Sequence, residues 1–203
     1  MLDVLTEHVV LLLRSAPPPN DWLAAGNEAT HALCLALVGR VLAVESVDRA
    51  WCADIQHHLV EALLIALARR DGAAQIALVE MDELALTRIE NELRRDFPNI
   101  EITPVLGDCG DSAVIGHALR LASPEAVFHA AAYKQVPVLE TQLREAVRNN
   151  VLATATVAQE AQAAGVGTFV LISTDKAVDP VNVLGATKRL AEMVCQDLAG
   201  SDS

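Results

Sequence analysis

Two short apolar runs in this chain lead directly into side chains that can exchange protons with a ligand. Tyr133 and Lys134 follow the run at residues 126–129, and a hydroxyl, carboxyl and amino series follows the run at residues 169–172: Ser173, Thr174, Asp175 and Lys176. In an open α/β sheet, the carboxyl ends of the strands form the crevice that binds ligands. If both runs are strands, these side chains are candidates for acid–base chemistry.

The lysines point to the same part of the chain. Lysine and arginine total 15, but only Lys134, Lys176 and Lys188 are lysines, and all three lie between residues 127 and 195. A bias toward arginine explains why lysine is scarce, but it does not explain where the remaining lysines lie.

Residues 75–198 alternate between strand-like and helix-like patterns. Apolar runs of strand length lie at residues 75–80, 100–105, 126–129 and 168–173. Amphipathic stretches of helical period lie at residues 82–96, 111–121, 140–164 and 183–198. Strands that are apolar on both faces and alternate with helices are typical of sheets covered on both sides. We therefore predict an α/β fold with a doubly wound parallel sheet of Rossmann type.

The N-terminal residues differ in pattern from the rest of the chain. We expect a helix over residues 2–14, ended by a proline run, and a second helix over residues 20–37, begun by an Asn-Asp capping pair. A short buried strand is expected at residues 41–44. The predicted organisation is an N-terminal helical extension at residues 1–40 and a Rossmann-like dinucleotide-binding domain at residues 41–203.

The strand expected at residues 41–44 lacks the turn that normally follows the first Rossmann strand. That turn is rich in glycine, because only glycine lets the backbone approach a pyrophosphate at the helix N-terminus. Here no glycine lies between Gly39 and Gly72, and Glu45 and Asp48 follow the strand instead. Two acidic side chains would repel a pyrophosphate at this position.

Composition excludes several classes of function. The 203 residues are 52% hydrophobic and carry a formal net charge of −12, which argues for a folded core and against nucleic acid as a partner. No apolar run reaches the roughly 18 residues that a membrane-spanning helix needs. The four cysteines are scattered without a C-x-x-C pair, and no signal peptide is evident, so we expect a cytoplasmic protein with reduced thiols.

From about residue 76 to residue 196 the chain resembles the polysaccharide-biosynthesis dehydratases of the extended short-chain dehydrogenase/reductase superfamily. These enzymes are 4,6-dehydratases that act on UDP-N-acetylglucosamine. The resemblance is carried by four words in the family's order: PVLGDCGD at 104–111, VFHAAAYKQVPVLE at 127–140, AVRNNV at 146–151 and LISTDKAVDPVNVLGATKRLAE at 171–192.

The resemblance implies catalytic roles for three adjacent residues. The family oxidises C4 of the sugar with NAD or NADP, eliminates water across C5 and C6, and returns the hydride to C6. Lys176 would remove the C5 proton, Asp175 would protonate the departing C6 hydroxyl, and Thr174 would hydrogen-bond the C4 oxygen. A lysine base needs a pKa lowered by burial or by a nearby cation.

The resemblance also implies residues that hold the cofactor and the substrate. Lys188 matches the lysine that holds the nicotinamide ribose, with Leu184 at the superfamily's tyrosine position. The other cofactor positions are on the adenine side and at strand ends: Glu80, Asp108, Cys109, Ala130 and Ala131. Tyr133 and Lys134 match the substrate side, and the substrate is a nucleotide sugar. The family continues beyond the Lys188 helix into a substrate-binding portion, which we expect to be absent here.

Several of these positions have simpler interpretations. The segment at residues 173–175 could be a turn or helix cap, Asp108 could end a strand, and Glu80 could belong to an acidic helix start. We expect Asn149 and Asn150 to make structural hydrogen bonds and His129 to be a satisfied core histidine. No metal site is expected, because adjacent helical positions such as His57 and His58 point about 100° apart.

Three functions therefore remain open. The first is a nucleotide-sugar 4,6-dehydratase, the second is a non-catalytic homologue that acts as a binding or assembly module, and the third is a nucleotide-sugar epimerase. The chain could also form a homo-oligomer.

Overall fold

The structure, a computed structural model, describes residues 10–15 and 73–200. Its core is a five-stranded sheet with the order β3-β2-β1-β4-β5. The strands are β1 (Val10–Ser15), β2 (Ala73–Glu80), β3 (Glu101–Leu106), β4 (Ala126–His129) and β5 (Thr168–Leu171). Strands β2 and β3 pair in parallel, and so do β4 and β5. Whether the two pairs point in the same direction depends on how the central strand pairs with β2 and with β4.

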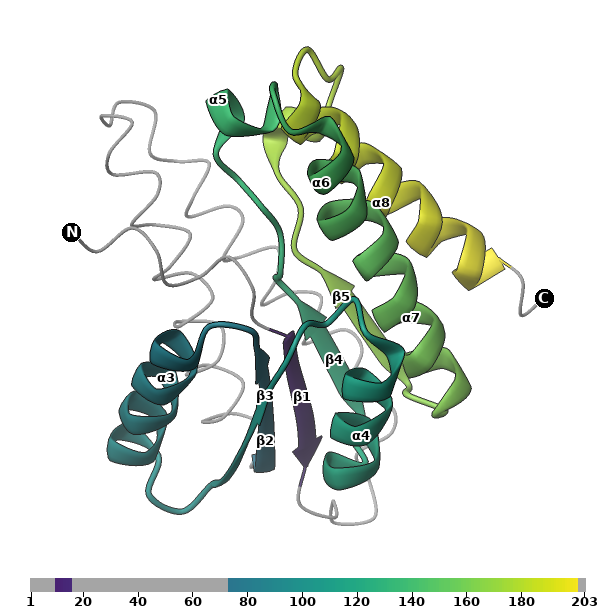
Figure 1. The fold of residues 1–203 in the computed structure, drawn as a ribbon. Helices are drawn as coiled ribbons and strands as arrows, with labels where there is room; N and C mark the ends of the chain where they lie inside the picture. The colour runs from purple at the N-terminus through teal and green to yellow at the C-terminus, as the bar shows by residue number, and fades with distance from the viewer. Residues whose placement is uncertain (1–9, 16–72, 201–203) are drawn as a thin grey trace.

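Strand β1 provides that link, and it runs antiparallel to both neighbours. Val10 lies opposite Val79 of β2 and opposite His129 of β4, so β1 begins where the other strands end. Figure 1 shows β1 between β2 and β4. The sheet is therefore mixed, and the predicted all-parallel sheet is wrong at its centre.

The predicted helix at residues 2–14 is also wrong for residues 10–14, which belong to strand β1. The run of consecutive apolar residues there has no period that separates a helix from a strand buried on both faces. Strand β1 belongs to the sheet, although residues 1–40 were expected to form a separate extension. The predicted helix at residues 20–37 and the predicted strand at residues 41–44 lie outside the described residues, so the division at residue 40 stays a prediction.

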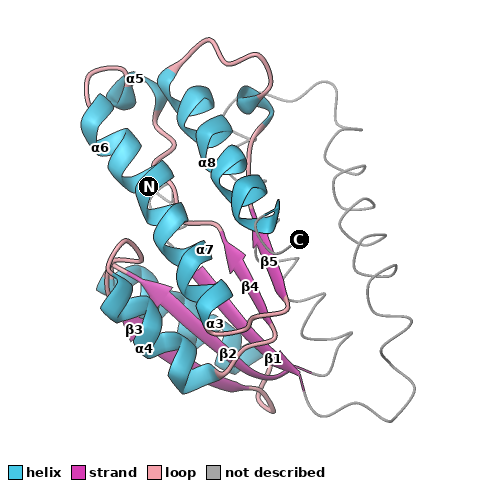
Figure 2. Cartoon of the chain, turned by 90° about the vertical axis from the view of Figure 1, so that its right-hand side faces the viewer, coloured by secondary structure: helices cyan, strands magenta, loops and turns pink. Residues whose placement is uncertain are grey.

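The helices after β2 largely match their predicted positions. They are α3 (Glu83–Asp96), α4 (Ser112–Ala122), α7 (Ala153–Ala163) and α8 (Val183–Gly200). The helix predicted at residues 140–164 is divided into α6 (Leu143–Val147), the π-helical turn η1 (Arg148–Leu152) and α7, and Figure 2 shows these three as one continuous rod beside α8. Two short elements complete the described part: α5 (Val136–Leu139) and the 3₁₀ turn η2 (Asp175–Ala177).

Alternate residues of the strands face opposite layers. Ala77 and Val79 of β2 pack with buried residues of α4 and α7, whereas Ile76 and Leu78 pack with those of α3. Successive strand residues point to opposite faces, so each core takes every second residue. This sandwich of helices on both faces fixes the strand ends that carry the candidate site. No described helix is long and apolar enough to cross a membrane.

Candidate active site

The Thr174–Asp175–Lys176 segment forms a tight turn just past the end of β5. The Thr174 side chain caps the 3₁₀ turn η2, and its Oγ1 donates a hydrogen bond to Asp175 Oδ1 at 3.0 Å. Lys176 Nζ lies 3.5 Å from the same oxygen. The carboxylate is 87% exposed and the lysine side chain 47% exposed. The structure thus brings together the three residues predicted to be catalytic, with their polar groups open to solvent.

Asp175 is held as a carboxylate in this arrangement. The hydrogen bond from Thr174 is the largest cause that lowers its pKa, and the positive charge of Lys176 lowers it further. A general acid needs the opposite shift, because it must keep its proton until the leaving group departs. Donation by Asp175 therefore requires that Thr174 release it.

Helix α8 lies directly on this turn. A Cβ atom at Gly185 would lie 2.0 Å from the backbone oxygen of Lys176, so only glycine allows this approach. The start of α8 is also fixed by Glu140, whose Oε1 accepts a hydrogen bond from Val183 N at 2.8 Å. Sequence reasoning missed both residues, although each lies inside one of the words that carry the family resemblance.

Lys188 lies under the same turn. It is 4% exposed, and its Nζ donates to the carbonyl oxygen of Ile172 at 2.6 Å. Burial lowers the pKa of this lysine to about 8, against opposing effects of Glu192 and Cys195. Its predicted contact with a nicotinamide ribose stays a prediction, and the observed contact is with the end of β5.

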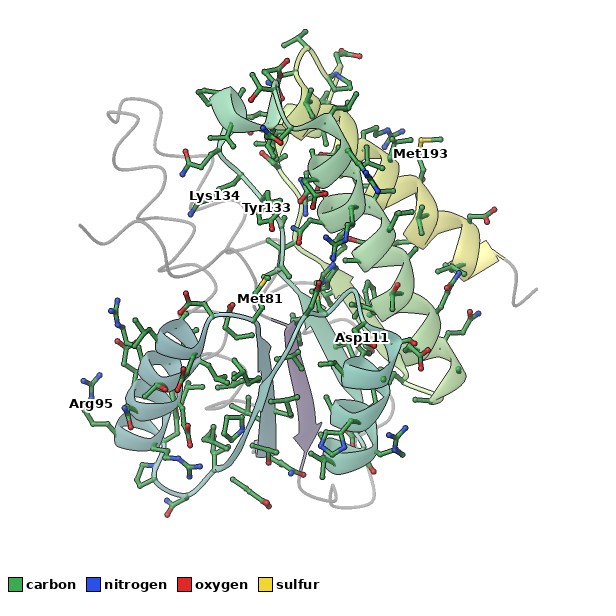
Figure 3. The ribbon with its side chains drawn as sticks, viewed as in Figure 1. Met81, Arg95, Asp111, Tyr133, Lys134 and Met193 are labelled. Carbon is green, nitrogen blue, oxygen red and sulfur yellow. The ribbon has the colours of Figure 1, made fainter. Side chains whose placement is uncertain are left out.

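Tyr133 and Lys134 lie in the loop that follows β4. The Tyr133 side chain packs against a small apolar cluster that contains Leu139, Ala146 and Leu184. Figure 3 shows Tyr133 and Lys134 side by side along this loop. Both side chains are half-buried. Leu184, at the superfamily's tyrosine position, thus serves as packing for Tyr133.

A cavity of about 720 Å³ opens beside this loop, at the edge where β2, β3 and β4 end. This volume is within the range of small-molecule sites. The Thr174–Lys176 turn is not part of its wall. Its lining includes Met81, Asp108, Tyr133, Arg148, Asn149 and Thr156.

Asp108 and Arg148 form the charged side of this cavity. Asp108 Oδ2 lies 3.6 Å from Arg148 Nη2, and Asp108 Oδ1 accepts a hydrogen bond from Gly110 N at 2.7 Å. Asp108 thus does shape the end of its strand, as the simpler interpretation proposed, and it also faces the cavity. Sequence reasoning missed Arg148, because the sequence of a helix does not distinguish an arginine that lines a cavity from one that only contacts solvent.

The remaining predicted cofactor residues are mostly buried. Glu80 is 1% exposed, and its Oε1 accepts a hydrogen bond from Asp82 N at 2.8 Å. Cys109 is buried, and burial raises the pKa of its thiol to about 12. Ala131 is 2% exposed, while Ala130 is half-buried. None of these four lines the cavity, so their predicted contacts with a cofactor stay predictions.

His129 is buried at the end of β4, as expected for a core histidine. Its Nε2 is 2.9 Å from Thr154 Oγ1, which itself donates to the backbone oxygen of Asn150. Nε2 must therefore carry the proton, and Nδ1 has no hydrogen-bond partner in the described part of the chain. The expectation that this histidine is fully satisfied is wrong for Nδ1. Among the described residues, no cluster of histidine, cysteine or carboxylate side chains could hold a metal; His57 and His58 lie outside them.

A sheet covered by helices on both faces, with acid–base side chains at the ends of β4 and β5, is the architecture of a Rossmann-related α/β protein. The fold is similar to that of DesIV, a dTDP-glucose 4,6-dehydratase from Streptomyces venezuelae, solved with NAD and TYD bound. The TM-score is 0.55 at 22% identity, with 68% of this chain and 46% of that chain covered. Residues 59–203 match the family described as polysaccharide biosynthesis protein, and the chain belongs to this family.

Parts of two longer curated proteins are similar to this chain. The capsular polysaccharide biosynthesis protein CapD of Staphylococcus aureus is 45% identical over 130 residues, which are 64% of this chain and 22% of CapD. The UDP-glucose 4-epimerase of Rickettsia canadensis is 38% identical over 103 residues, which are 51% of this chain and 30% of the epimerase. The chain thus spans only about a fifth of the length of CapD and less than a third of the epimerase.

The described residues fit one half of NAD or NADP better than the other. The cavity offers a nucleoside the Asp108 carboxylate and the Asn149 amide, which can pair with hydroxyl groups and base edges. The helix N-termini after β2 and β3 do not suit a pyrophosphate. Asp82 Oδ1 accepts from Ala85 N at 2.7 Å and Asp111 Oδ1 accepts from Ala113 N at 2.8 Å, so carboxylates occupy both positions.

Proposed function

We propose that this chain carries the acid–base site of a nucleotide-sugar 4,6-dehydratase. One observation supports this most strongly. The hydroxyl of Thr174 and the ammonium group of Lys176 lie 3.0 Å and 3.5 Å from the same carboxylate oxygen of Asp175, at an open strand end. An elimination across two adjacent sugar carbons needs an acid and a base at this kind of spacing.

Each of the three residues has a distinct role in the proposal. Lys176 removes the proton at C5, and Asp175 protonates the hydroxyl that departs from C6. Thr174 donates to the C4 oxygen of the sugar. When Thr174 turns to that oxygen, Asp175 loses the hydrogen bond that most lowers its pKa, so its carboxyl group can better hold the proton that it must donate. Substrate binding would thus prepare the acid for its step.

Tyr133 and Lys134 are proposed to contact the nucleotide sugar from the neighbouring strand end. Both follow β4, which pairs directly with β5, so the loop and the catalytic turn lie at the same edge. A bound nicotinamide would accept the hydride from C4 and return it to C6, so that the cofactor is unchanged over the whole reaction. The cavity beside Tyr133 is the proposed site for its adenosine half.

A second candidate is a non-catalytic binding or assembly module, and the direction of β1 favours it. The central strand of a Rossmann sheet delivers its following turn to the carboxyl edge, where the pyrophosphate binds. Here β1 starts at that edge with Val10 and ends with Ser15 beside Ala73, at the opposite edge. The last residue of β1 therefore lies at the edge away from the candidate site.

One experiment separates these functions and the epimerase alternative. The protein is incubated with UDP-N-acetylglucosamine and NAD⁺ or NADP⁺, and the products are analysed by liquid chromatography and mass spectrometry. A dehydratase yields a product that has lost one water, whereas an epimerase yields an isomer of unchanged mass. A binding module leaves the sugar intact but shows saturable binding by calorimetry.

The variants Lys176→Ala and Asp175→Asn should abolish the water loss. Arg88→Ala is the matched control, because it removes an exposed cation from α3, a helix that does not contribute to the Thr174–Lys176 turn. If neither the wild-type protein nor a cofactor-supplemented preparation converts or binds the sugar, the proposal is overturned. Equal turnover by wild type and Lys176→Ala would reject the assigned base.

A further inference from the structure

The side chain of Asn150 makes four hydrogen bonds to other described residues. It is fully buried in the π-helical turn η1. Its Oδ1 accepts from Tyr133 N at 2.8 Å and from Asn149 Nδ2 at 3.2 Å. Its Nδ2 donates to Tyr133 O at 3.0 Å and to Thr187 Oγ1 at 3.1 Å. Since an amide has two donors and an oxygen with two lone pairs, its capacity is filled.

The Tyr133 backbone fixes which way round the Asn150 amide lies. A backbone N–H can only donate and a backbone oxygen can only accept. A flipped amide would therefore place donor against donor and acceptor against acceptor at Tyr133. The side chain of Asn150 thus hydrogen-bonds both the backbone N–H and the backbone oxygen of Tyr133, which is the pairing that a neighbouring strand would give.

The second grip of Asn150 is on helix α8. Thr187 Oγ1 donates to Leu184 O at 2.9 Å, so its lone pairs are available to accept from Asn150. The next residue, Lys188, holds the Ile172 carbonyl at the base of the catalytic turn. One turn of α8 therefore contacts both sides of the candidate site. Thr187 is linked through Asn150 to the loop after β4, and Lys188 bonds directly to the end of β5.

The π-helical turn is what brings Asn150 into this position. A π-turn leaves backbone carbonyl groups outside the regular helical ladder, and such turns are frequent at functional sites. The backbone oxygen of Asn150 accepts instead from Thr154 Oγ1 at 2.8 Å. Thr154 in turn contacts His129 at the end of β4. Side chain and backbone of Asn150 thus connect β4, the loop after it and α8.

We infer that Asn150 is a positioning residue that sets the distance between the Tyr133–Lys134 loop and the Thr174–Lys176 turn. This inference rests on the proposed function, in which the two loops contact the same nucleotide sugar. The Asn150 side chain is fully buried, and its hydrogen bonds go to Tyr133, Asn149 and Thr187. It acts by fixing the backbone of Tyr133 to the helix that also supports the catalytic turn.

The test uses the fact that Tyr133 is the only tyrosine in the chain. Protein labelled with ¹⁵N-tyrosine gives a single backbone amide signal, which reports directly on the bond from Tyr133 N to Asn150. In wild type this amide should exchange slowly with solvent. Asn150→Ala and Asn150→Asp should speed its exchange roughly ten-fold, because each breaks the two-sided grip.

The controls separate local loosening from general unfolding. Asn91→Asp makes the same charge change on the exposed face of α3 and should leave the Tyr133 exchange rate unchanged. The amide of Phe128, in the middle of the sheet, should stay protected in every folded variant. If the Asn150 variants do not fold, Thr187→Val decides, because it removes the link between Asn150 and α8 while leaving both Asn150 bonds to Tyr133, and it should speed exchange by a few-fold.

A second readout connects the grip to substrate. Titration of wild type with UDP-N-acetylglucosamine should shift the Tyr133 signal, and Asn150→Asp should need at least several-fold more ligand for the same shift. Unchanged Tyr133 exchange in folded Asn150 variants and in Thr187→Val would overturn the inference. Faster exchange in the variants, with no ligand shift even in wild type, would instead support the positioning role and refute the proposed substrate.

Discussion

The ammonium group of Lys188 lies 2.6 Å from the carbonyl oxygen of Ile172, buried beneath the turn that carries the catalytic candidates. Ile172 N in turn donates to His129 O at 3.0 Å, which extends the pairing of β4 and β5 by one residue. The lysine thus completes a chain of backbone contacts that holds the end of β5 in place. This contact makes Lys188 part of the scaffold of the turn, whatever else it binds.

Burial of Lys188 should make stability depend on pH in the alkaline range. Its pKa is lowered from an ordinary 10.5 to about 8, so between these values the unfolded chain binds more protons than the folded one. Stability from this group therefore rises with pH, by about 2 kcal/mol between pH 8 and pH 10. Urea unfolding of wild type and Lys188→Met at both pH values measures the difference.

The wild-type free energy of unfolding should rise relative to that of Lys188→Met over this interval. Lys176→Met is the control, because it leaves Lys188 in place and should retain the wild-type pH dependence. Parallel curves for wild type and Lys188→Met would show that the lysine is not buried as described.

Gly185→Ala should destabilise the protein by about 1–3 kcal/mol, because the added Cβ would overlap the Lys176 backbone oxygen. Gly200→Ala is a matched control on the same helix. A Cβ at Gly200 meets nothing within 4 Å, and alanine favours a helix over glycine. Chemical denaturation of both variants tests the close approach of α8 to the catalytic turn. Equal stability of the two would contradict it.

Thr174→Val should raise the pKa of Asp175 toward its ordinary range, because the Thr174 hydroxyl is the main cause of its lowering. Carboxyl ¹³C chemical shifts followed by NMR over an acid titration measure this directly. Asp175→Asn identifies the signal by its disappearance. An unaltered titration in Thr174→Val would mean that Asp175 is stabilised by some other group.

A proline at the centre of β1 should be poorly tolerated. Leu12 pairs with Ala77 on one side and Val127 on the other, so Leu12→Pro removes a donor from a strand bonded at both edges. The expected loss is about 3 kcal/mol or more. Ala43→Pro is the informative comparison, because residues 41–44 were predicted to be the first Rossmann strand.

Thermal melts of the two variants decide between the two candidate central strands. Strong destabilisation by Leu12→Pro with a small effect of Ala43→Pro supports the antiparallel sheet. The reverse pattern would mean that the segment at residues 41–44 occupies the centre instead.

The sequence predicted the elements after residue 73 well, because their patterns are long and distinct. The strand at residues 126–129 and the start of α8 at Val183 fall where they were predicted. The short run that forms β1 could not be assigned. Five apolar residues in a row suit either a buried strand or a buried helix, and only the pairing partners, Val79 and His129, decide between them.

Site residues could be predicted where their side-chain type and their spacing along the chain pointed to a function. They could not be predicted where their role depends on neighbours from distant segments. The grouping of Asp175 with Lys176 follows from adjacency along the chain. The roles of Arg148 and Gly185 depend on their spatial neighbours, Asp108 and the Lys176 backbone, and no local sequence pattern predicts these contacts. Asn150 was expected to make structural hydrogen bonds, which is confirmed, but its partners Tyr133 and Thr187 come from distant segments.

The central position of β1 also bears on the order in which the sheet assembles during synthesis. In the described residues, the parallel pairs β2–β3 and β4–β5 are joined only through β1, since β2 and β4 do not pair. Residues 10–15 leave the ribosome before either partner, and their second ladder waits for residues 126–129. Such long-range closure slows folding and leaves both edges of an apolar strand unpaired meanwhile. Strand β1 therefore cannot complete its pairing until residues 126–129 have been synthesised.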